Sequence, residues 1–519
     1  MTHSLSTRRL FLRDATLAAA GISTFPNLIF GEAADMPNVK LTVGGGSAGP
    51  LVPRDFVGLS YESMQLEDPS FFSPANVSLV QQFRAISPRG VLRLGGNTSE
   101  FGWWKAKATD PAPKRVDSPW KAGGEPTAAT LFAITPEAID HLSGFLHATG
   151  WSCIYGLNLG YGTPETDIPE ATYVFNKLGP HLEYFQVGNE VDLFKGHLRD
   201  PQTWNVDRYL TEWLVITQAV QKALPEAKFG MPDVAGDVSW LAKIADRWSA
   251  ITDKPHVSTL SHHHYWGGPP SNPDVNIENL LKPDGRVGSD ARTAREAAEK
   301  LGPGVSWRMT EGNTVYRGGK DGLSDVFAAA LWSADYLLQL MTLGYAGVNL
   351  HGGSGHAQAV SVGGVFHGEA LMKDPTVPHP KPFYTPIANE GTLAGAGVNG
   401  KLNGTYVLEP VAYGMKFASA FAGATMIPVS FDPGRVNAVA YAAKRPDGKT
   451  IIAVLNKDVS KPIKVIGPNA DLIATLMAPA LDSREAHLET VQHGTASRSI
   501  GGDGSFTVPE HTGMLLVLR

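Results

Sequence analysis

The sequence predicts an α/β fold, a (β/α)8 TIM barrel with an appended β-sandwich domain to which both termini contribute. From Phe56 to about Phe421, short apolar runs with a strand-like pattern alternate with amphipathic stretches, and eight such units are typical of a closed barrel. After Phe421 the helical patterns stop, and short strands separated by Gly, Pro and Asp turns follow. The chain also holds 56 Gly and 37 Pro among 519 residues, a share above the usual sum of about 12%, which indicates many loops.

The barrel prediction depends on eight apolar runs that precede or follow helical patterns. The candidate strands are Phe56–Ser63, Gly90–Asn97, Cys153–Gly160, Tyr184–Val191, Lys228–Ala235, Thr259–Trp266, Ser306–Asn313 and Gly347–Gly353. The candidate helices are Val77–Ile86, Pro136–Ala148, Arg208–Ala223, Ser239–Trp248, Ala291–Leu301 and Asp325–Leu343. A doubly wound open sheet is the main rival, but it normally carries a glycine-rich loop after its first strand, and Leu59–Ser63 is not one.

The two ends of the chain carry the strands expected in the sandwich. These strands are Val39–Val43, Val436–Ala442, Thr450–Asn456, Pro462–Val465, Leu472–Met477 and Met514–Leu518. The sequence thus predicts a barrel over residues 56–421 and a sandwich built from residues 34–55 and 422–519.

The first 33 residues are typical of an export signal. Arg8 and Arg9 precede a weak apolar region, and small residues follow at 31–33, which resembles a bacterial twin-arginine signal peptide. A disordered basic N-terminus is the alternative. No later stretch reaches the roughly 18 uninterrupted apolar residues of a membrane span. We therefore expect an exported protein, periplasmic or secreted, without a membrane anchor.

Composition and charge exclude several classes of protein. A net charge of −6 disfavours a protein that binds nucleic acid, where a basic surface is expected. The single cysteine, Cys153, excludes an intrachain disulfide and a cysteine-rich metal site. Among His262, His263 and His264 only the first and third share a face of a strand, and no further ligand stands out. We expect no metal, no cofactor and no obligate protein partner.

Polar side chains gather where six of the eight candidate strands end, the end that carries catalysis in such barrels. The sharpest pair is Glu190, on the fourth strand, and Glu311, on the seventh. Two facing carboxyl groups are what glycosidic cleavage requires, because one protonates the leaving oxygen while the other attacks carbon. Either glutamate alone is as consistent with capping a helix or pairing with arginine. Together they predict a glycosidase.

The segments around this pair resemble those of glycoside hydrolase family 79, the β-glucuronidase and heparanase family, and within it the bacterial exo-β-glucuronidase type. The resemblance spans essentially the whole mature chain. The segments that carry it are Tyr61-Glu62, Leu92–Asn97, Val187–Glu190, His264-Tyr265, Trp307–Asn313, Tyr316–Gly318 and Val348–Gly353.

The resemblance implies a role for each matching position. Glu190 would be the acid/base, and Glu311 the nucleophile of a retaining mechanism, whose carboxyl groups lie about 5–5.5 Å apart. The residues expected to bind substrate are Glu62 and Asn189 at sugar hydroxyls, Tyr265 at the nucleophile, and Tyr316, Gly318 and Tyr384 at the uronic acid carboxylate.

One departure from the family concerns the loop after the eighth strand. In the family this loop is compact and ends in a tyrosine that touches the carboxylate, whereas here residues 354–381 are long and Tyr384 is the candidate. The insertion leaves the aglycone preference open.

The resemblance implies a retaining exo-acting β-D-glucuronidase whose substrate is a small-molecule or oligosaccharide β-glucuronide. The alternatives are an endo-acting heparanase- or hyaluronidase-like enzyme, a clan member acting on neutral sugars, and a catalytically silent carbohydrate-binding protein. The net charge of −6 favours a short glucuronide over a long polyanion.

Overall fold

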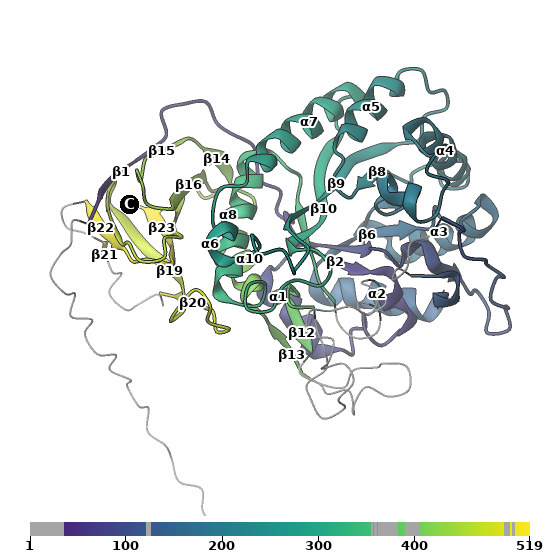
Figure 1. Cartoon of the computed structure of the whole chain (residues 1–519), viewed down its shortest axis with the longest axis horizontal. Coiled ribbons are helices and arrows are strands. Elements are labelled where there is room, and N and C mark those ends of the chain that lie inside the picture. Colours follow the sequence, from purple (N-terminus) through teal and green to yellow (C-terminus); the bar gives the residue numbers. More distant parts are fainter. Residues whose placement is uncertain are drawn as a thin grey trace, which may run out of the picture. The chain divides into compact units, whose positions relative to one another are not determined.

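The computed structural model describes residues 36–120, 126–353, 357, 361, 382–389, 405–491, 499–500 and 504–519. Eight parallel strands close into a barrel in the order β10-β11-β2-β3-β6-β7-β8-β9, and β9 pairs with β10 (Figure 1). They are β2 (Val57–Glu62), β3 (Val91–Gly95), β6 (Ser152–Leu157), β7 (Leu182–Val187), β8 (Phe229–Val234), β9 (Val257–Gly267), β10 (Ser306–Val315) and β11 (Val348–His351). Each overlaps one predicted run, so the predicted barrel is confirmed.

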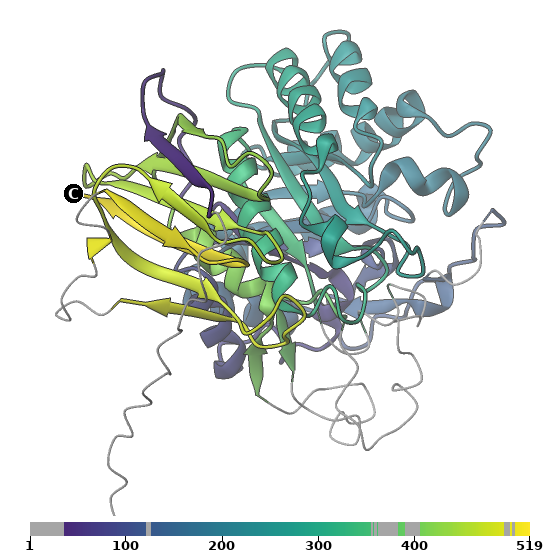
Figure 2. The same ribbon diagram turned by 60° about the vertical axis from the view of Figure 1, so that its left-hand side comes forward.

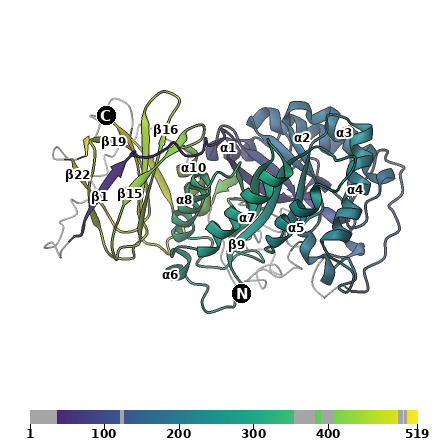
Figure 3. The same ribbon diagram turned by 90° about the horizontal axis from the view of Figure 1, so that it is seen from above.

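Helices surround these strands on the outside, as the view from above shows (Figure 3). They are α1 (Val77–Ile86), α2 (Pro136–Thr149), α3 (Pro164–Leu178), α4 (Val206–Ala223), α5 (Ser239–Trp248), α6 (Ile277–Leu280), α7 (Gly285–Leu301), α8 (Phe327–Thr342) and α10 (Pro410–Ser419). Two short two-stranded sheets lie outside the barrel, β4 (Gly102–Trp104) with β5 (Phe132–Ile134), and β12 (Ile387–Asn389) with β13 (Tyr406–Leu408).

Helix α3 is absent from the predicted set because prolines obscure its pattern. Pro164 occupies the first turn, where a missing N–H costs nothing, but Pro169 lies inside the helix and removes one backbone hydrogen bond. Burial of Ala171, Val174 and Leu178 on one face offsets that loss.

Two sheets pack face to face to form the sandwich. The smaller has the order β15-β1-β18-β22, from β15 (Val429–Phe431), β1 (Asn38–Val43), β18 (Ile463–Ile466) and β22 (Ser505–Val508). The larger has the order β14-β16-β17-β23-β19-β20, from β14 (Thr425–Ile427), β16 (Ala438–Lys444), β17 (Thr450–Asn456), β23 (Thr512–Leu518), β19 (Ala470–Met477) and β20 (His487–Thr490), with β21 (Ser499–Ile500) on β19. Strand β1 lies among strands from the other end of the chain (Figure 2), so both termini contribute, as predicted.

Strand β17 is buried on both faces because it borders two cores. Ile452 and Val454 lie in the core between the two sheets, whereas Ile451 and Leu455 belong to the core that includes the barrel helices. The strand therefore reads as a continuous apolar run rather than an alternating one.

A buried ion pair also joins the larger sheet to the barrel. Lys457, only 2% exposed, lies 2.5 Å from Asp335 of α8, and the hydroxyl of Tyr441 donates to the same aspartate.

Two predictions concern residues outside the described parts. The export signal at residues 1–33 and the long loop 354–381 lie there, except for Ala357 and Ser361. Among the helices of the described segments, none combines the length and the apolarity needed to cross a bilayer.

Candidate active site

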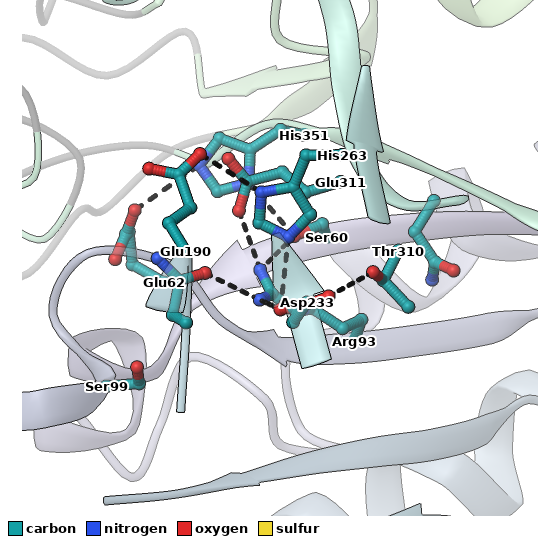
Figure 4. Close-up of polar contacts among 12 residues, drawn as sticks. Ser60, Glu62, Arg93, Ser99, Glu190, Asp233, His263, Thr310, Glu311 and His351 are labelled. Atoms are coloured by element: carbon teal, nitrogen blue, oxygen red, sulfur yellow. Dashed lines mark hydrogen bonds and ion pairs between the residues drawn. The ribbon is translucent and has the colours of Figure 1, made fainter. Parts of the chain in front are cut away.

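Glu190 and Glu311 lie together at the carboxyl ends of the barrel strands (Figure 4). One carboxylate oxygen of each and a ring nitrogen of His263 all lie within 4.8 Å of one another. Glu190 follows β7 in the left-handed backbone region, with φ of 48°, two residues after Gly188 with φ of 90°. Left-handed backbone at a non-glycine residue costs free energy, and residues in this conformation cluster at active sites. This turn directs the Glu190 side chain toward Glu311.

Arg93, on β3, is fully buried and its five N–H groups all point at oxygen atoms. Its Nη1 lies 2.7 Å from Glu311 Oε2, and its Nη2 lies 2.7 Å from Asn189 Oδ1. The remaining contacts are with Gln186 Oε1 at 3.0 Å, Ser60 Oγ at 3.1 Å, and Asp233. A guanidinium is always charged and has a rigid fork of donors, so Arg93 fixes the position of Glu311.

His263 connects Glu190 to Asp233. Its Nδ1 lies 3.1 Å from Glu190 Oε1, and its Nε2 lies 3.0 Å from Asp233 Oδ2. The other two histidines of the run point away from the site, because His262 contacts Tyr345 at 2.8 Å and His264 contacts Asp284 at 3.1 Å. Alternation along β9 therefore places only the middle histidine beside the glutamates.

The two glutamates have pKa values shifted in opposite directions. Burial raises the pKa of Glu190, although its contact with His263 opposes that rise. Burial would also raise the pKa of Glu311, but the charges of His351, His263 and Arg93 outweigh it and lower the pKa to about 2. Glu311 is thus ionised, while Glu190 tends to keep its proton. A nucleophile and a general acid require pKa values separated in this way.

Tyr265 and Tyr384 lie on the Glu311 side of the site. The Tyr265 hydroxyl donates to Glu311 Oε1 at 2.9 Å, and the two tyrosine rings lie 6.1 Å apart. Burial and the nearby Glu311 raise the pKa of each phenol well above its usual value, so both hydroxyls remain donors. Tyr384 also interacts with the backbone of Gly318.

Tyr316 and Gly318 form a loop next to these tyrosines. The Tyr316 ring meets the Tyr265 ring edge-on at 6.4 Å and remains 37% exposed. The carbonyl of Gly318 accepts a hydrogen bond of 2.7 Å from the N–H of Phe383, which joins this loop to the segment that carries Tyr384. The structure thus brings Tyr265, Tyr316, Gly318 and Tyr384 together.

Glu62, at the end of β2, is buried and contacts several protein groups. Its Oε2 accepts hydrogen bonds from the N–H and the hydroxyl of Thr98, at 2.9 and 2.7 Å. Its Oε1 lies 3.3 Å from His351 Nε2 and accepts from the hydroxyl of Ser361. These contacts fix its orientation and occupy both of its oxygens.

Glu100, a second buried acid, supports the turn that carries the acid/base candidate. Its carboxylate accepts from the N–H of Asn189 at 2.9 Å, of Leu159 at 2.8 Å and of Gly160 at 2.5 Å. Glu100 therefore holds the loop after β6 against the residue that precedes Glu190.

Within the described residues, one group of acidic and histidine side chains has the spacing of a metal site, namely Glu190, His263 and Glu311. Burial would lower the pKa of His263, but Asp233 and Glu311 outweigh it and raise the pKa to about 10. A protonated imidazole donates hydrogen bonds and does not ligate a metal. The chemistry of this group favours a hydrogen-bonded acid pair over a metal site.

The sequence is similar to those of two fungal β-glucuronidases. One, from Aspergillus niger, is 26% identical over 351 residues, which cover 61% of this chain and 62% of that protein. The other, from Neurospora crassa, is 26% identical over 299 residues, which cover 52% of this chain and 51% of that protein. The chain thus spans about half to three fifths of the length of these curated relatives. No family model matches the chain.

Solved structures share the fold over nearly the whole chain. A 4-O-α-L-rhamnosyl-β-D-glucuronidase from Fusarium oxysporum superposes with a TM-score of 0.64 at 17% identity, covering 93% of this chain and 100% of that one. An arabinofuranosidase of glycoside hydrolase family 51 from Xanthomonas axonopodis superposes with a TM-score of 0.61 at 16% identity, with coverage of 93% and 100%. At such identities these likenesses concern the fold.

Sequence reasoning missed Asp233 and assigned no contact with the glutamates to Arg93, His263 or His351. Asp233 ends β8 with its side chain fully buried. A single charged residue inside the apolar run Phe229–Val234 was the available signal, because a buried carboxylate needs a partner.

Proposed function

We propose that this chain is a retaining, exo-acting β-D-glucuronidase that hydrolyses terminal β-glucuronides. The proposal rests on one observation, the two carboxyl groups within 4.8 Å of each other whose pKa values are shifted apart. Similarity to two proteins named β-glucuronidase supports the choice of sugar. The ordered set of strand-end residues supports a relationship to glycoside hydrolase family 79.

The reaction would proceed in two steps. In the first, Glu190 gives its proton to the glycosidic oxygen while Glu311 attacks the anomeric carbon, so that the bond to the aglycone breaks and an ester to Glu311 forms. In the second, Glu190, now ionised, takes a proton from water, and the water oxygen displaces Glu311. Loss of the Glu311 charge in the ester lowers the pKa of Glu190, which suits its change from acid to base.

The remaining predicted residues would bind the sugar. The carboxylate of the uronic acid would be received by the hydroxyls of Tyr316 and Tyr384 and by the backbone at Gly318, since hydroxyl and N–H donors suit a charged acceptor. Asn189 would contact the 2-hydroxyl of the sugar, where the hydrogen bond strengthens in the transition state. Glu62 would hold further sugar hydroxyls through an oxygen that Ser361 or Thr98 now contacts.

The sugar preference is tested by hydrolysis of 4-nitrophenyl β-D-glucuronide beside the corresponding glucoside and xyloside. We expect the glucuronide to be preferred, and equal or faster hydrolysis of a neutral sugar would refute the uronate assignment. Release of internal fragments from an acidic oligosaccharide would favour endo action instead. An inactive protein that still binds glucuronides would indicate a carbohydrate-binding module.

The mechanism is tested by Glu190→Ala and Glu311→Ala, with Glu183→Ala at the other end of β7 as the matched control. Loss of the general acid should lower kcat by about 10²–10⁴-fold for poor leaving groups. Azide should rescue Glu190→Ala with a β-glycosyl azide and Glu311→Ala with an α-glycosyl azide, because it attacks from opposite faces. NMR of the first wild-type product should show the β anomer, and an α product would refute retention.

We also propose export through the twin-arginine signal at residues 1–33. The support is the Arg8-Arg9 pair followed by an apolar region. Fusing these residues to a reporter and replacing both arginines by lysine should block export, and unchanged export would refute the assignment.

A further inference from the structure

Asp233 contacts both cations that hold the glutamate pair. The carboxylate is 0% exposed and lies against the Arg93 guanidinium, which in turn lies 2.7 Å from Glu311. Its Oδ2 also lies 3.0 Å from Nε2 of His263, which contacts Glu190 at 3.1 Å. Figure 4 shows Asp233 below the pair, with dashed contacts leading toward both glutamates.

A third contact fixes the aspartate to the strand that carries the nucleophile candidate. The hydroxyl of Thr310 donates to Asp233 Oδ1, and Thr310 directly precedes Glu311 on β10. Asp233 itself has a left-handed backbone, with φ of 59°, at the end of β8. A left-handed backbone persists at a non-glycine residue where its surroundings hold it, as the contacts with Arg93, His263 and Thr310 do here.

We propose that Asp233 is a positioning residue that keeps His263 protonated and Arg93 in place, and so sets the charge state of Glu190 and the orientation of Glu311. This inference rests on the proposed glycosidase function of the pair. Without Asp233, the buried cations Arg93 and His263 would share a site with one ionised carboxylate, that of Glu311. The site would then lose the proton of His263 rather than one from Arg93, because arginine does not deprotonate.

The contacts around His263 predict in which direction the pH–rate profile moves when Asp233 is lost. Burial alone would deprotonate His263, and Asp233 is the strongest opposing influence on its pKa. A charged His263 beside Glu190 lowers the pKa of that carboxyl. Loss of Asp233 should therefore raise the pKa of Glu190 and shift the basic limb of the pH–rate profile upward.

The other ionisable groups near His263 and Asp233 come from several elements. They are Arg93 of β3, Tyr184 of β7, Glu190 and Asp192 after β7, Tyr209 of α4, His262 of β9, and Glu311 of β10. Burial raises the pKa of both tyrosines, so they stay neutral across the working pH range. Asp233→Asn replaces none of these side chains, so the charge that is lost beside His263 is that of residue 233.

The experiment compares the pH dependence of kcat/KM for Asp233→Asn with that of the wild type. The basic limb should move up by about one pH unit, the usual effect of losing a neighbouring charge, and kcat/KM at the optimum should fall by about 10²-fold. Asp325→Asn is the matched control, a 1% exposed aspartate paired with Arg484 away from the glutamates. It should keep the wild-type profile.

A double variant tests whether Asp233 affects Glu190 through its contact with His263 or through its contact with Arg93. If the limb moves because His263 loses its proton, adding His263→Gln to Asp233→Asn should shift the limb no further than His263→Gln alone. Additive shifts would overturn the inference. So would an unchanged limb in Asp233→Asn, because a merely structural residue lowers the rate without moving the limb.

A measurement on the wild type keeps the inference testable if Asp233→Asn does not fold. In protein with ¹⁵N-labelled histidine, the ring nitrogens of His263, assigned with His263→Gln, should both remain protonated at pH 8. A neutral ring at pH 7 would overturn the inference. This result is independent of substrate, so failure to hydrolyse any β-glucuronide would refute the proposed function and not the role of Asp233.

Discussion

Replacing Arg93 by methionine should destabilise the protein by an amount that grows with pH. In the wild type, the Arg93 guanidinium makes buried ion pairs with Asp233 and Glu311. Burial would raise the pKa of Asp233, but Arg93 and His263 hold it well below its usual range. In the unfolded chain these carboxyls have a pKa of about 4, and above that pH the ion pairs stabilise the fold fully. The stabilisation is lost only as the pH falls through the lower pKa values that the carboxyls have in the folded state.

The variant should reverse this dependence. Without the guanidinium, burial dominates at Asp233, for which Arg93 is the largest lowering influence, and raises the pKa of that carboxyl, so the folded state binds more protons than the unfolded state above pH 4. Stability then falls as the pH rises.

The size of the effect follows from the contacts that remain. Removing one partner of a buried ion pair costs about 3–5 kcal/mol. Asp233 keeps His263 and Thr310, and Glu311 keeps Tyr265, so the lower figure applies. We expect Arg93→Met to lower the free energy of unfolding by about 3 kcal/mol at pH 7. As the pH approaches 4, this loss should shrink by about 1.4 kcal/mol for each unit by which the substitution has raised a carboxyl pKa.

Thermal unfolding at pH 4.5, 5.5 and 7.0 measures this effect. The gap between the midpoints of wild type and Arg93→Met should widen steadily with pH. Arg247→Met is the control, since Arg247 pairs with Asp207 on the surface and should cost little at any of these pH values. A gap that stays constant or narrows with pH would show that Arg93 does not hold these carboxyls ionised.

Three further outcomes are expected. Tyr265→Phe removes the 2.9 Å hydrogen bond to Glu311 and should lower kcat by about 10–100-fold with little change in KM, which steady-state kinetics on the aryl glucuronide would measure. Glu62→Gln should raise KM more than it lowers kcat if Glu62 binds sugar hydroxyls, and an effect on kcat alone would argue against that role. Lys457→Met leaves Asp335 without its buried cation and should lower the thermal midpoint while preserving kcat of the folded protein, so a kcat change would contradict a purely structural role.

The barrel could be predicted because each parallel strand is a short apolar run and each intervening helix has its own periodicity. Val77–Ile86 and Ser239–Trp248 have the predicted bounds, since both are amphipathic with a clear hydrophobic face. Short strands such as β14 and β15 were missed because three residues carry too little pattern. Their pairing with β16 and β1 forms them, and that pairing is non-local.

That Glu190 and Glu311 lie together could be predicted from the rule that functional polar residues gather at the carboxyl ends of barrel strands, whereas the groups that surround them could not. Asp233 contacts Arg93, 140 residues away in sequence, and no local signal reports such a contact. The predicted shared face of His262 and His264 is real, but that face points away from the glutamates. Which face of β9 meets the site follows from the barrel register, which pairs His263 with Glu311.

The opposite pKa shifts of the two glutamates arise from barrel closure rather than from their own sequence neighbours. Glu311 meets His351 from the neighbouring strand β11, and it meets Arg93 from β3, a strand that comes near it only because the sheet closes. Glu190 lies at the rim with 18% of its side chain exposed, and His263 is the cation in contact with it. Burial raises the pKa of both carboxyls, and the surplus of positive charge around Glu311 is what separates them. A change of charge on β3, β8 or β11 should therefore alter the pH optimum even though neither glutamate is itself replaced.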